Sequence, residues 1–252
     1  MAVDLQLDGK MALVLGASRG LGRAIAVSLQ NEGVDVITVA RSENEIGAFR
    51  HITADLDDPA APDQTIAAVR DTGRPLDILV LNSGGPPTGT AANTTPSDFA
   101  SVWDRMFNAQ LALTQAFLPD MRSHGFGRIL AVASTSVITP IPGLVLSNTV
   151  RAALASWCKT LAAEVAGDGV TVNLLLPGQI ATDRLASLHA ARAEGMGLSK
   201  DDVVARAMAA VPAGRFGRPE EFGDMAAFLA SPRAGYVTGC AIKVDGGMTA
   251  SL

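Results

Sequence analysis

MALVLGASRGLG, residues 11–22, is the stretch of sequence that decides the fold of this chain. It opens with an apolar run that shows no alternation, which is typical of a parallel strand covered on both faces. A glycine-rich turn follows, and residues 20–32 then have the apolar spacing of a helix. The stretch therefore predicts the first strand, turn and helix of an open α/β sheet.

The rest of the chain repeats this alternation of apolar runs and longer helical stretches. Further strand candidates lie at 34–39, 78–81, 128–132 and 170–176, and further helix candidates at 59–72, 96–124, 148–167 and 218–231. Strands and helices in this order imply right-handed crossovers between parallel strands. We therefore predict one α/β domain, residues 1–252, on a Rossmann-like doubly wound parallel sheet of about seven strands with helices on both faces.

The composition excludes several classes of protein. The 252 residues are 48% hydrophobic and only 18% charged, so a mainly disordered chain is excluded. The net charge of −5 has the wrong sign for a nucleic-acid or anionic membrane partner. Cysteines and histidines are scattered, so we expect no metal site and no disulfide framework. Because the chain shows neither a signal core nor an apolar run of ~20 residues, we expect a cytoplasmic protein.

The glycine turn after the first predicted strand is a candidate phosphate-binding loop. Glycines let the backbone approach a pyrophosphate, and a helix N-terminus supplies N–H donors and the positive end of its dipole. Glycine spacing alone is a weak signal, but here a strand precedes it and a helix follows. We therefore predict contacts with a dinucleotide from Gly16, Ser18, Arg19, Gly20, Leu21 and Gly22.

The spacing Gly-x-x-x-Gly-x-Gly resembles the short-chain dehydrogenase/reductase (SDR) superfamily, and further matches follow in order along essentially the whole chain. Asn82-Ser83-Gly84-Gly85 resembles the family's Asn-Asn-Ala-Gly, and the segment 177–182 resembles the one that holds the nicotinamide carboxamide. RFGRPEE at 215–221 and VDGG at 244–247 resemble the reductases of 3-oxoacyl carrier-protein thioesters. The cofactor contacts implied by the resemblance are Asp55, Leu56, Asn82, Gly84, Pro177, Gly178, Ile180 and Thr182.

Charge at the end of the second predicted strand favours NADP over NAD. An acidic residue there would bond the ribose 2′-hydroxyl of NAD and repel a 2′-phosphate. This chain has Val39-Ala40-Arg41-Ser42 instead, with Arg19 in the glycine turn. Guanidinium groups suit a phosphate, and the alternative is two ordinary surface arginines. The stretch from Arg41 to Asp55 is too short for a full helix and a strand, so we expect that helix to be very short or missing.

The positions that the family uses for catalysis mostly carry other residues here. SDR enzymes use a Tyr-x-x-x-Lys pair on a helix, a Ser on the preceding strand and often an Asn. The sequence SNTVRAAL fits the family's Tyr-x-x-x-Lys-Ala-Ala-Leu frame, which puts Ser147 in the Tyr slot and Arg151 in the Lys slot. Ser134 lies at the family's usual distance before that slot. Met106 stands in the Asn slot, and Asn108 is expected to point to another side of its helix.

The usual proton donor is absent from the whole chain. The single tyrosine is Tyr236, and no lysine lies four residues after it. A serine hydroxyl is a far weaker acid than a phenol, whose pKa is ~10, and an arginine stays charged. Ser134, Ser147 and Arg151 are therefore the candidate catalytic residues, with water carrying the proton. Lys159 is expected to be a surface lysine. The chain resembles a 3-oxoacyl-acyl-carrier-protein-reductase-like subgroup with an imperfect catalytic tetrad.

Two functions remain open at this point. The first is an NADP(H)-linked oxidoreductase that acts on a small carbonyl or alcohol substrate, and the retained nicotinamide segment favours it. The alternative is an NADP-binding pseudoenzyme with a regulatory or structural role, which the empty Tyr and Lys slots favour. A non-redox enzyme built on Ser134 ranks last, because no neighbouring base is evident.

The segment 183–213 is predicted to be a substrate lid, since helical excursions after a strand often build pockets. A surface helical hairpin is equally consistent with its sequence. Arg184, Arg192 and Arg206 fit an anionic ligand, and Glu194, Asp201 and Asp202 in the same segment weaken that inference.

Self-association is also expected. Small residues on the helix candidate 148–167 allow a second helix to approach closely, and SDR proteins commonly pair through this helix. These residues are Ala152, Ala153, Ala155, Ala162 and Ala163, with Trp157 and Leu161 as bulky contacts. We expect a homo-oligomer, a tetramer before a dimer, although a core-facing amphipathic helix would explain the same alanines.

Overall fold

The computed structural model describes residues 4–42 and 49–251. Within them, seven parallel strands form one sheet in the order β3-β2-β1-β4-β5-β6-β7. The strands are β1 (Met11–Leu15), β2 (Asp35–Ala40), β3 (Arg50–Thr53), β4 (Ile78–Leu81), β5 (Gly127–Val132), β6 (Val170–Pro177) and β7 (Ala241–Val244). The predicted doubly wound parallel sheet is confirmed, and β3 and β7 add to the five predicted strands.

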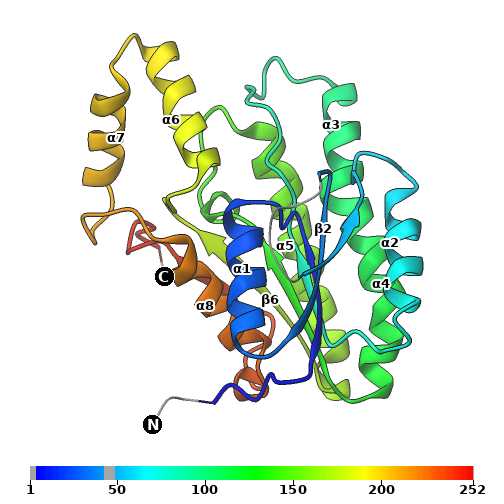
Figure 1. Ribbon diagram of the computed structural model, residues 1–252. Coiled ribbons are helices and arrows are strands. Elements are labelled where there is room, and N and C mark those ends of the chain that lie inside the picture. Colours follow the sequence, from blue (N-terminus) through cyan, green and yellow to red (C-terminus); the bar gives the residue numbers. More distant parts are fainter. Residues whose placement is uncertain (1–3, 43–48, 252) are drawn as a thin grey trace.

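Helices cover both faces of the sheet (Figure 1). One face carries α1 (Gly20–Asn31) and α8 (Pro219–Ala230), and the other carries α2 (Ala61–Arg70), α4 (Ala109–Ser123) and α5 (Val145–Val165). Helices α1 and α8 touch so closely that a Cβ on Gly223 would lie 2.6 Å from the Ala24 carbonyl oxygen. Among the described residues, no helix is both long enough and apolar enough to cross a membrane.

The unbroken apolar runs are explained by burial on both sides. Leu13 and Leu15 of β1 face the core under α2, α4 and α5, whereas Ala12 and Val14 face the core under α1 and α8. Alternate residues of a strand point to opposite faces, so a strand covered on both needs apolar residues at every position.

Helices α6 (Asp183–Met196) and α7 (Lys200–Ala209) form a hairpin that projects from the body of the molecule (Figure 1). They lie in the predicted lid segment 183–213, and the role of this hairpin as a substrate lid stays a prediction. The expectation of a very short or missing helix after β2 falls mainly on residues 43–48, which lie outside the described residues.

The helix predicted over 96–124 is confirmed as one continuous helical stretch from Pro96 to Ser123, and it contains a π turn. The structure has α3 (Pro96–Trp103), a π-helical turn at Asp104–Asn108, and then α4. A π turn widens the helix locally and changes which side chains face inward. Met106 is buried against Leu146 of α5, while the Asn108 amide donates to the Asp104 carboxylate at 2.7 Å. The π turn thus lies where Met106 packs against α5.

Candidate active site

The predicted site residues gather at one edge of the sheet. The glycine turn follows β1, Asn82 follows β4, Ser134 lies just beyond β5, and Pro177 ends β6. Because the strands are parallel, their carboxyl ends meet at this edge. The strand order reverses between β1 and β4, and a crevice at such a reversal is the usual ligand position in open α/β sheets.

Asn82 ties the end of β4 to the glycine turn. Its buried side-chain amide donates to the carbonyl oxygens of Leu15, at 3.1 Å, and Gly16, at 3.2 Å. Gly16 adopts a positive φ of 60°, and a Cβ there would lie 2.8 Å from the Asn82 Nδ2 atom. The resemblance implied a cofactor contact for Asn82. The structure shows a positioning contact, in which Asn82 holds the turn in shape.

Gly22 has no room for a side chain, because a Cβ would lie 2.3 Å from the Gly16 carbonyl oxygen. We expect Gly22→Ala to lower the free energy of unfolding by about 1–3 kcal/mol, the usual cost of overpacking a filled site. Gly195→Ala in α6 is the matched control, since open space surrounds that helical glycine. Alanine there is expected to stabilise by up to about 1 kcal/mol. Urea denaturation measures both, and an unchanged Gly22→Ala midpoint would contradict the crowding argument.

The start of α1 offers free donors to an anion. Arg19 occupies the N-cap position in an extended conformation, and no side chain caps the helix, so N–H groups of the first turn are left for a ligand or water. Arg19 and Arg41 are both exposed, and neither forms an ion pair within residues 4–42 and 49–251. Ser18 is half-buried and Leu21 packs on the core, so these two shape the turn. A cradle with no space for Cβ atoms, free N–H groups and two guanidinium groups fits a dinucleotide phosphate.

The segment 177–182 lies beside this turn. Gly178 lies beside the end of β7, where its N–H donates to the Val244 carbonyl oxygen at 3.0 Å. Ile180 is buried, and Thr182 caps α6 by accepting the Leu185 N–H at 3.3 Å. The Thr182 methyl group lies 3.7 Å from where a Cβ on Gly20 would stand. The structure thus brings together two stretches far apart in sequence, as the predicted cofactor site requires.

Asp55 and Leu56 lie just after β3, beyond the end of that strand. The exposed Asp55 carboxylate accepts the Asp57 N–H at 3.2 Å, and Leu56 packs against the core. Gly84, in the loop after β4, has open space around it. Contacts of these three residues with a cofactor stay predictions.

Arg151 is buried, with 8% of its surface exposed. Its Nη1 atom donates to the carbonyl oxygens of Val132 and Ala133, and its Nε atom donates to the Ser147 hydroxyl oxygen at 3.2 Å. Burial, with the positive charge of Arg184, lowers the pKa of Arg151 to about 10. The guanidinium therefore remains a cation at neutral pH, held at the end of β5.

Ser134 stands next to these carbonyls. Its hydroxyl oxygen accepts the Ser136 N–H at 3.1 Å at the start of a short 3₁₀ turn. Ser147 lies on the first turn of α5, because that helix begins at Val145 and not near residue 148 as predicted. Ser134, Ser147 and Arg151 therefore come together around the end of β5, and each serine oxygen already accepts one hydrogen bond.

Neither Tyr236 nor Lys159 can replace the missing pair. Tyr236 is fully exposed, and the next residue, Val237, accepts a hydrogen bond from Asn173 in the middle of β6. That position is away from the carboxyl ends of the strands. Lys159 is exposed on α5 and donates to the Gly239 carbonyl at 2.8 Å, so the predicted surface role of Lys159 is confirmed.

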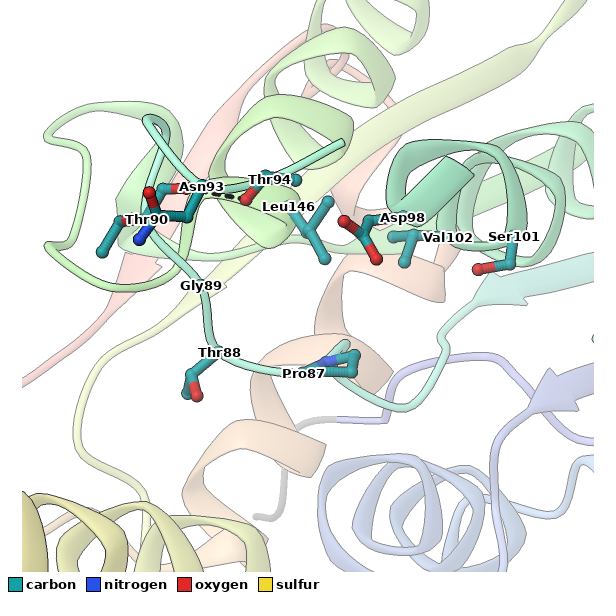
Figure 2. Close-up of a pocket in the computed structure, with 10 residues that line it drawn as sticks. All are labelled: Pro87, Thr88, Gly89, Thr90, Asn93, Thr94, Asp98, Ser101, Val102 and Leu146. Carbon is teal, nitrogen blue, oxygen red and sulfur yellow. Dashed lines mark hydrogen bonds between the residues drawn. The ribbon is translucent and has the colours of Figure 1, made fainter. Parts of the chain in front are cut away.

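A cavity of about 220 Å³ opens between the loop after β4, α3 and the start of α5 (Figure 2). Leu146, the neighbour of Ser147 in sequence, forms part of its wall. The polar lining is mostly neutral, and its carboxylate, Asp98, caps α3 through Thr95. This cavity was not predicted from the sequence. Its signal was the run TGTAANTT at residues 88–95, whose small hydroxyl side chains supply much of the lining.

Known proteins match almost the full length of the chain. Residues 16–249 match the model of the family described as enoyl-(acyl carrier protein) reductase. The chain is 33% identical to the 3-oxoacyl-[acyl-carrier-protein] reductase FabG of Escherichia coli (strain K12), over 97% of this chain and 99% of FabG. The L-sorbose reductase of Gluconobacter frateurii, solved with NADPH and L-sorbose, superposes with a TM-score of 0.91 at 30% identity, covering 99% of this chain and 100% of that one. YwfH, an NADPH-dependent reductase involved in bacilysin biosynthesis, superposes with a TM-score of 0.91 at 26% identity, covering 96% and 99%.

Proposed function

Because this chain belongs to the short-chain dehydrogenase/reductase superfamily and is FabG-like, we propose that it is an NADP(H)-linked oxidoreductase that reduces a carbonyl or oxidises a secondary alcohol. The observation that carries the proposal is that the segment 177–182 lies beside the glycine turn, with the Thr182 methyl group 3.7 Å from where a Cβ on Gly20 would stand. A protein that only bound nucleotide phosphates would have no need to place a nicotinamide segment there. Two structural neighbours are NADPH-dependent or NADPH-bound reductases, which agrees with the NADP prediction.

The chain's own groups account for cofactor binding as follows. The first turn of α1 takes the pyrophosphate, Arg19 and Arg41 take the 2′-phosphate, and the segment 177–182 takes the nicotinamide carboxamide. When bound, NADPH supplies the hydride for carbonyl reduction.

Ser134 and Ser147 orient the substrate carbonyl. The Ser136 N–H and the Arg151 Nε–H each occupy an acceptor position on one serine, which leaves both O–H protons to donate to the substrate oxygen. The fixed charge of Arg151 stabilises the negative charge that develops on that oxygen. A serine does not release its proton readily, so water delivers the proton, and turnover is slower than with a tyrosine.

The pseudoenzyme alternative rests on one observation. The Arg151 guanidinium already donates hydrogen bonds to two main-chain carbonyls and to the Ser147 hydroxyl. Under this alternative its role is to stabilise the local structure. Under this alternative the chain binds NADP and has a regulatory or structural role without redox turnover.

Titration with NADPH and NADH, followed by a panel of carbonyl compounds, separates these functions. We expect saturable binding that favours NADPH, and slow NADPH oxidation that is lost in Ser134→Ala. Ser156→Ala, an exposed serine on α5, is the matched control and is expected to keep full activity. NADPH binding without turnover on any carbonyl would support the pseudoenzyme, and binding of neither nucleotide would overturn both functions.

A cytoplasmic homotetramer remains part of the proposal. Ala152 and Ala163 are exposed on α5 and can meet a second helix, whereas Leu161 and Ala162 are buried in the chain's own core. Close approach of a partner helix would therefore use the outer alanines.

A further inference from the structure

Two arginines bring positive charge to the same side of the candidate site. Arg151 is held at the end of β5, and Arg184 reaches in from the first turn of α6. The Arg184 Nη2 atom donates to the Pro86 carbonyl at 3.0 Å. The same guanidinium lies close over Gly85, where a Cβ would be 3.1 Å from Nη2. Arg184 thus spans from α6 to the loop after β4, next to the end of the strand from which the site is built.

In the part of the chain that the structure describes, no carboxylate forms an ion pair with Arg151 or Arg184. The ion pairs there use other arginines, such as Arg105 with Asp57 and Arg122 with Asp168. Arg151 and Arg184 donate instead to neutral main-chain carbonyls and a hydroxyl. The charge of Arg184 is close enough to Arg151 to lower the pKa of its guanidinium. The buried Arg151 and the exposed Arg184 therefore bring two cations to the ends of the neighbouring strands β5 and β4, and neither has an ion-pair partner among the described residues.

Only one of the three arginines in the predicted lid reaches this site. Arg192 lies further along α6, where its charge acts on His189, and Arg206 is exposed on α7. The sequence of the segment 183–213 mixes acidic and basic residues, but the structure brings Arg184 alone of its three arginines to the loop after β4. The arginine that faces the site is Arg184.

A buried guanidinium without an anion is unfavourable, and a second cation nearby adds to the cost. An incoming oxyanion relieves both, and a guanidinium fork bonds carboxylate and phosphate oxygens well. We propose that the substrate is a carbonyl or alcohol compound carrying an oxyanion, either a carboxylate or a phosphate, which binds between Arg151 and Arg184. The proposal rests on the proposed function for the reacting carbonyl, while the oxyanion site is argued from this chain alone. The uncharged part of the substrate faces the cavity of Figure 2, whose lining is mostly neutral and includes one carboxylate, that of Asp98.

Calorimetric binding to the protein saturated with NADP⁺ tests the proposal with two matched pairs of probes. One pair is 3-hydroxybutanoate and its methyl ester, and the other is dihydroxyacetone phosphate and dihydroxyacetone. We expect the charged member of at least one pair to bind about tenfold or more tightly than the neutral member. The pair that discriminates identifies the oxyanion as carboxylate or phosphate.

Variants assign the effect to Arg184. Arg184→Gln is expected to abolish the preference for the charged probe, and Arg206→Gln, with the same charge change on the same lid, is expected to keep it. The proposal is overturned if neither pair discriminates, if Arg184→Gln keeps the preference, or if that variant weakens NADP⁺ and not the charged probe. If the protein binds no NADP⁺, the same titrations without nucleotide still measure binding at the oxyanion site. Failure of the proposed oxidoreductase function can therefore be distinguished from failure of the oxyanion-site proposal.

Discussion

Replacing Ser147 with Tyr and Arg151 with Lys in one variant is expected to raise the rate of NADPH-dependent carbonyl reduction by about 10²–10⁴-fold, the usual contribution of a positioned general acid. Ser147 and Arg151 are one turn apart on α5 and already hydrogen-bonded, so a phenol and an ammonium would stand in the same relation. The phenol has a pKa of ~10 and releases its proton far more readily than serine.

The measurement is kcat/KM with NADPH and a reactive ketone, alongside thermal denaturation to verify folding. Ser147 is buried, so the single Ser147→Tyr variant reports whether the phenol is accommodated. Ser156→Tyr, at an exposed position of the same helix, is expected to leave the rate unchanged. Adding Ser134→Ala to the double variant is expected to remove most of the gain. A folded, NADPH-binding double variant with no rate gain would show that Ser147 does not occupy the position of the proton donor.

Replacing Arg41 with Asp is expected to weaken NADPH binding by about 100-fold while NADH binding stays equal or improves. The change removes a charge-assisted hydrogen bond to the 2′-phosphate, worth about 1.5–3 kcal/mol, and places a repelling carboxylate beside it. The same carboxylate can accept the ribose 2′-hydroxyl of NADH. Arg41 is exposed at the end of β2, so the substitution leaves the core intact.

Fluorescence titration of both nucleotides measures the change in preference. Arg206→Asp changes the charge by the same amount on α7 and is expected to leave both affinities unchanged. Equal weakening of NADPH and NADH would mean that Arg41 supports the fold of the pocket without reading the 2′-phosphate. An unchanged NADPH affinity would show that Arg41 is an ordinary surface arginine that does not contact the 2′-phosphate.

Local patterns in the sequence determined the sheet and the phosphate cradle. An apolar run such as Met11–Leu15, followed by a glycine turn, is typical of a strand covered on both faces, and Gly16 and Gly20 have the positive φ angles that glycine adopts without strain. These are properties of neighbouring residues, so they can be seen without a structure. Sequence also determined that the chain has no Tyr-x-x-x-Lys pair, because counting residues needs no coordinates.

Tertiary structure alone decided what the unusual residues touch. The sequence could not show that Arg151 would bond the end of β5, or that Arg184 and not Arg192 would lie near it. It also could not show that a π turn would lie within the helix around Met106. Each of these depends on contacts between segments far apart in the chain. The net charge of a site depends on which charged side chains the fold brings together, and these can come from distant parts of the chain. A local sequence pattern therefore cannot predict it.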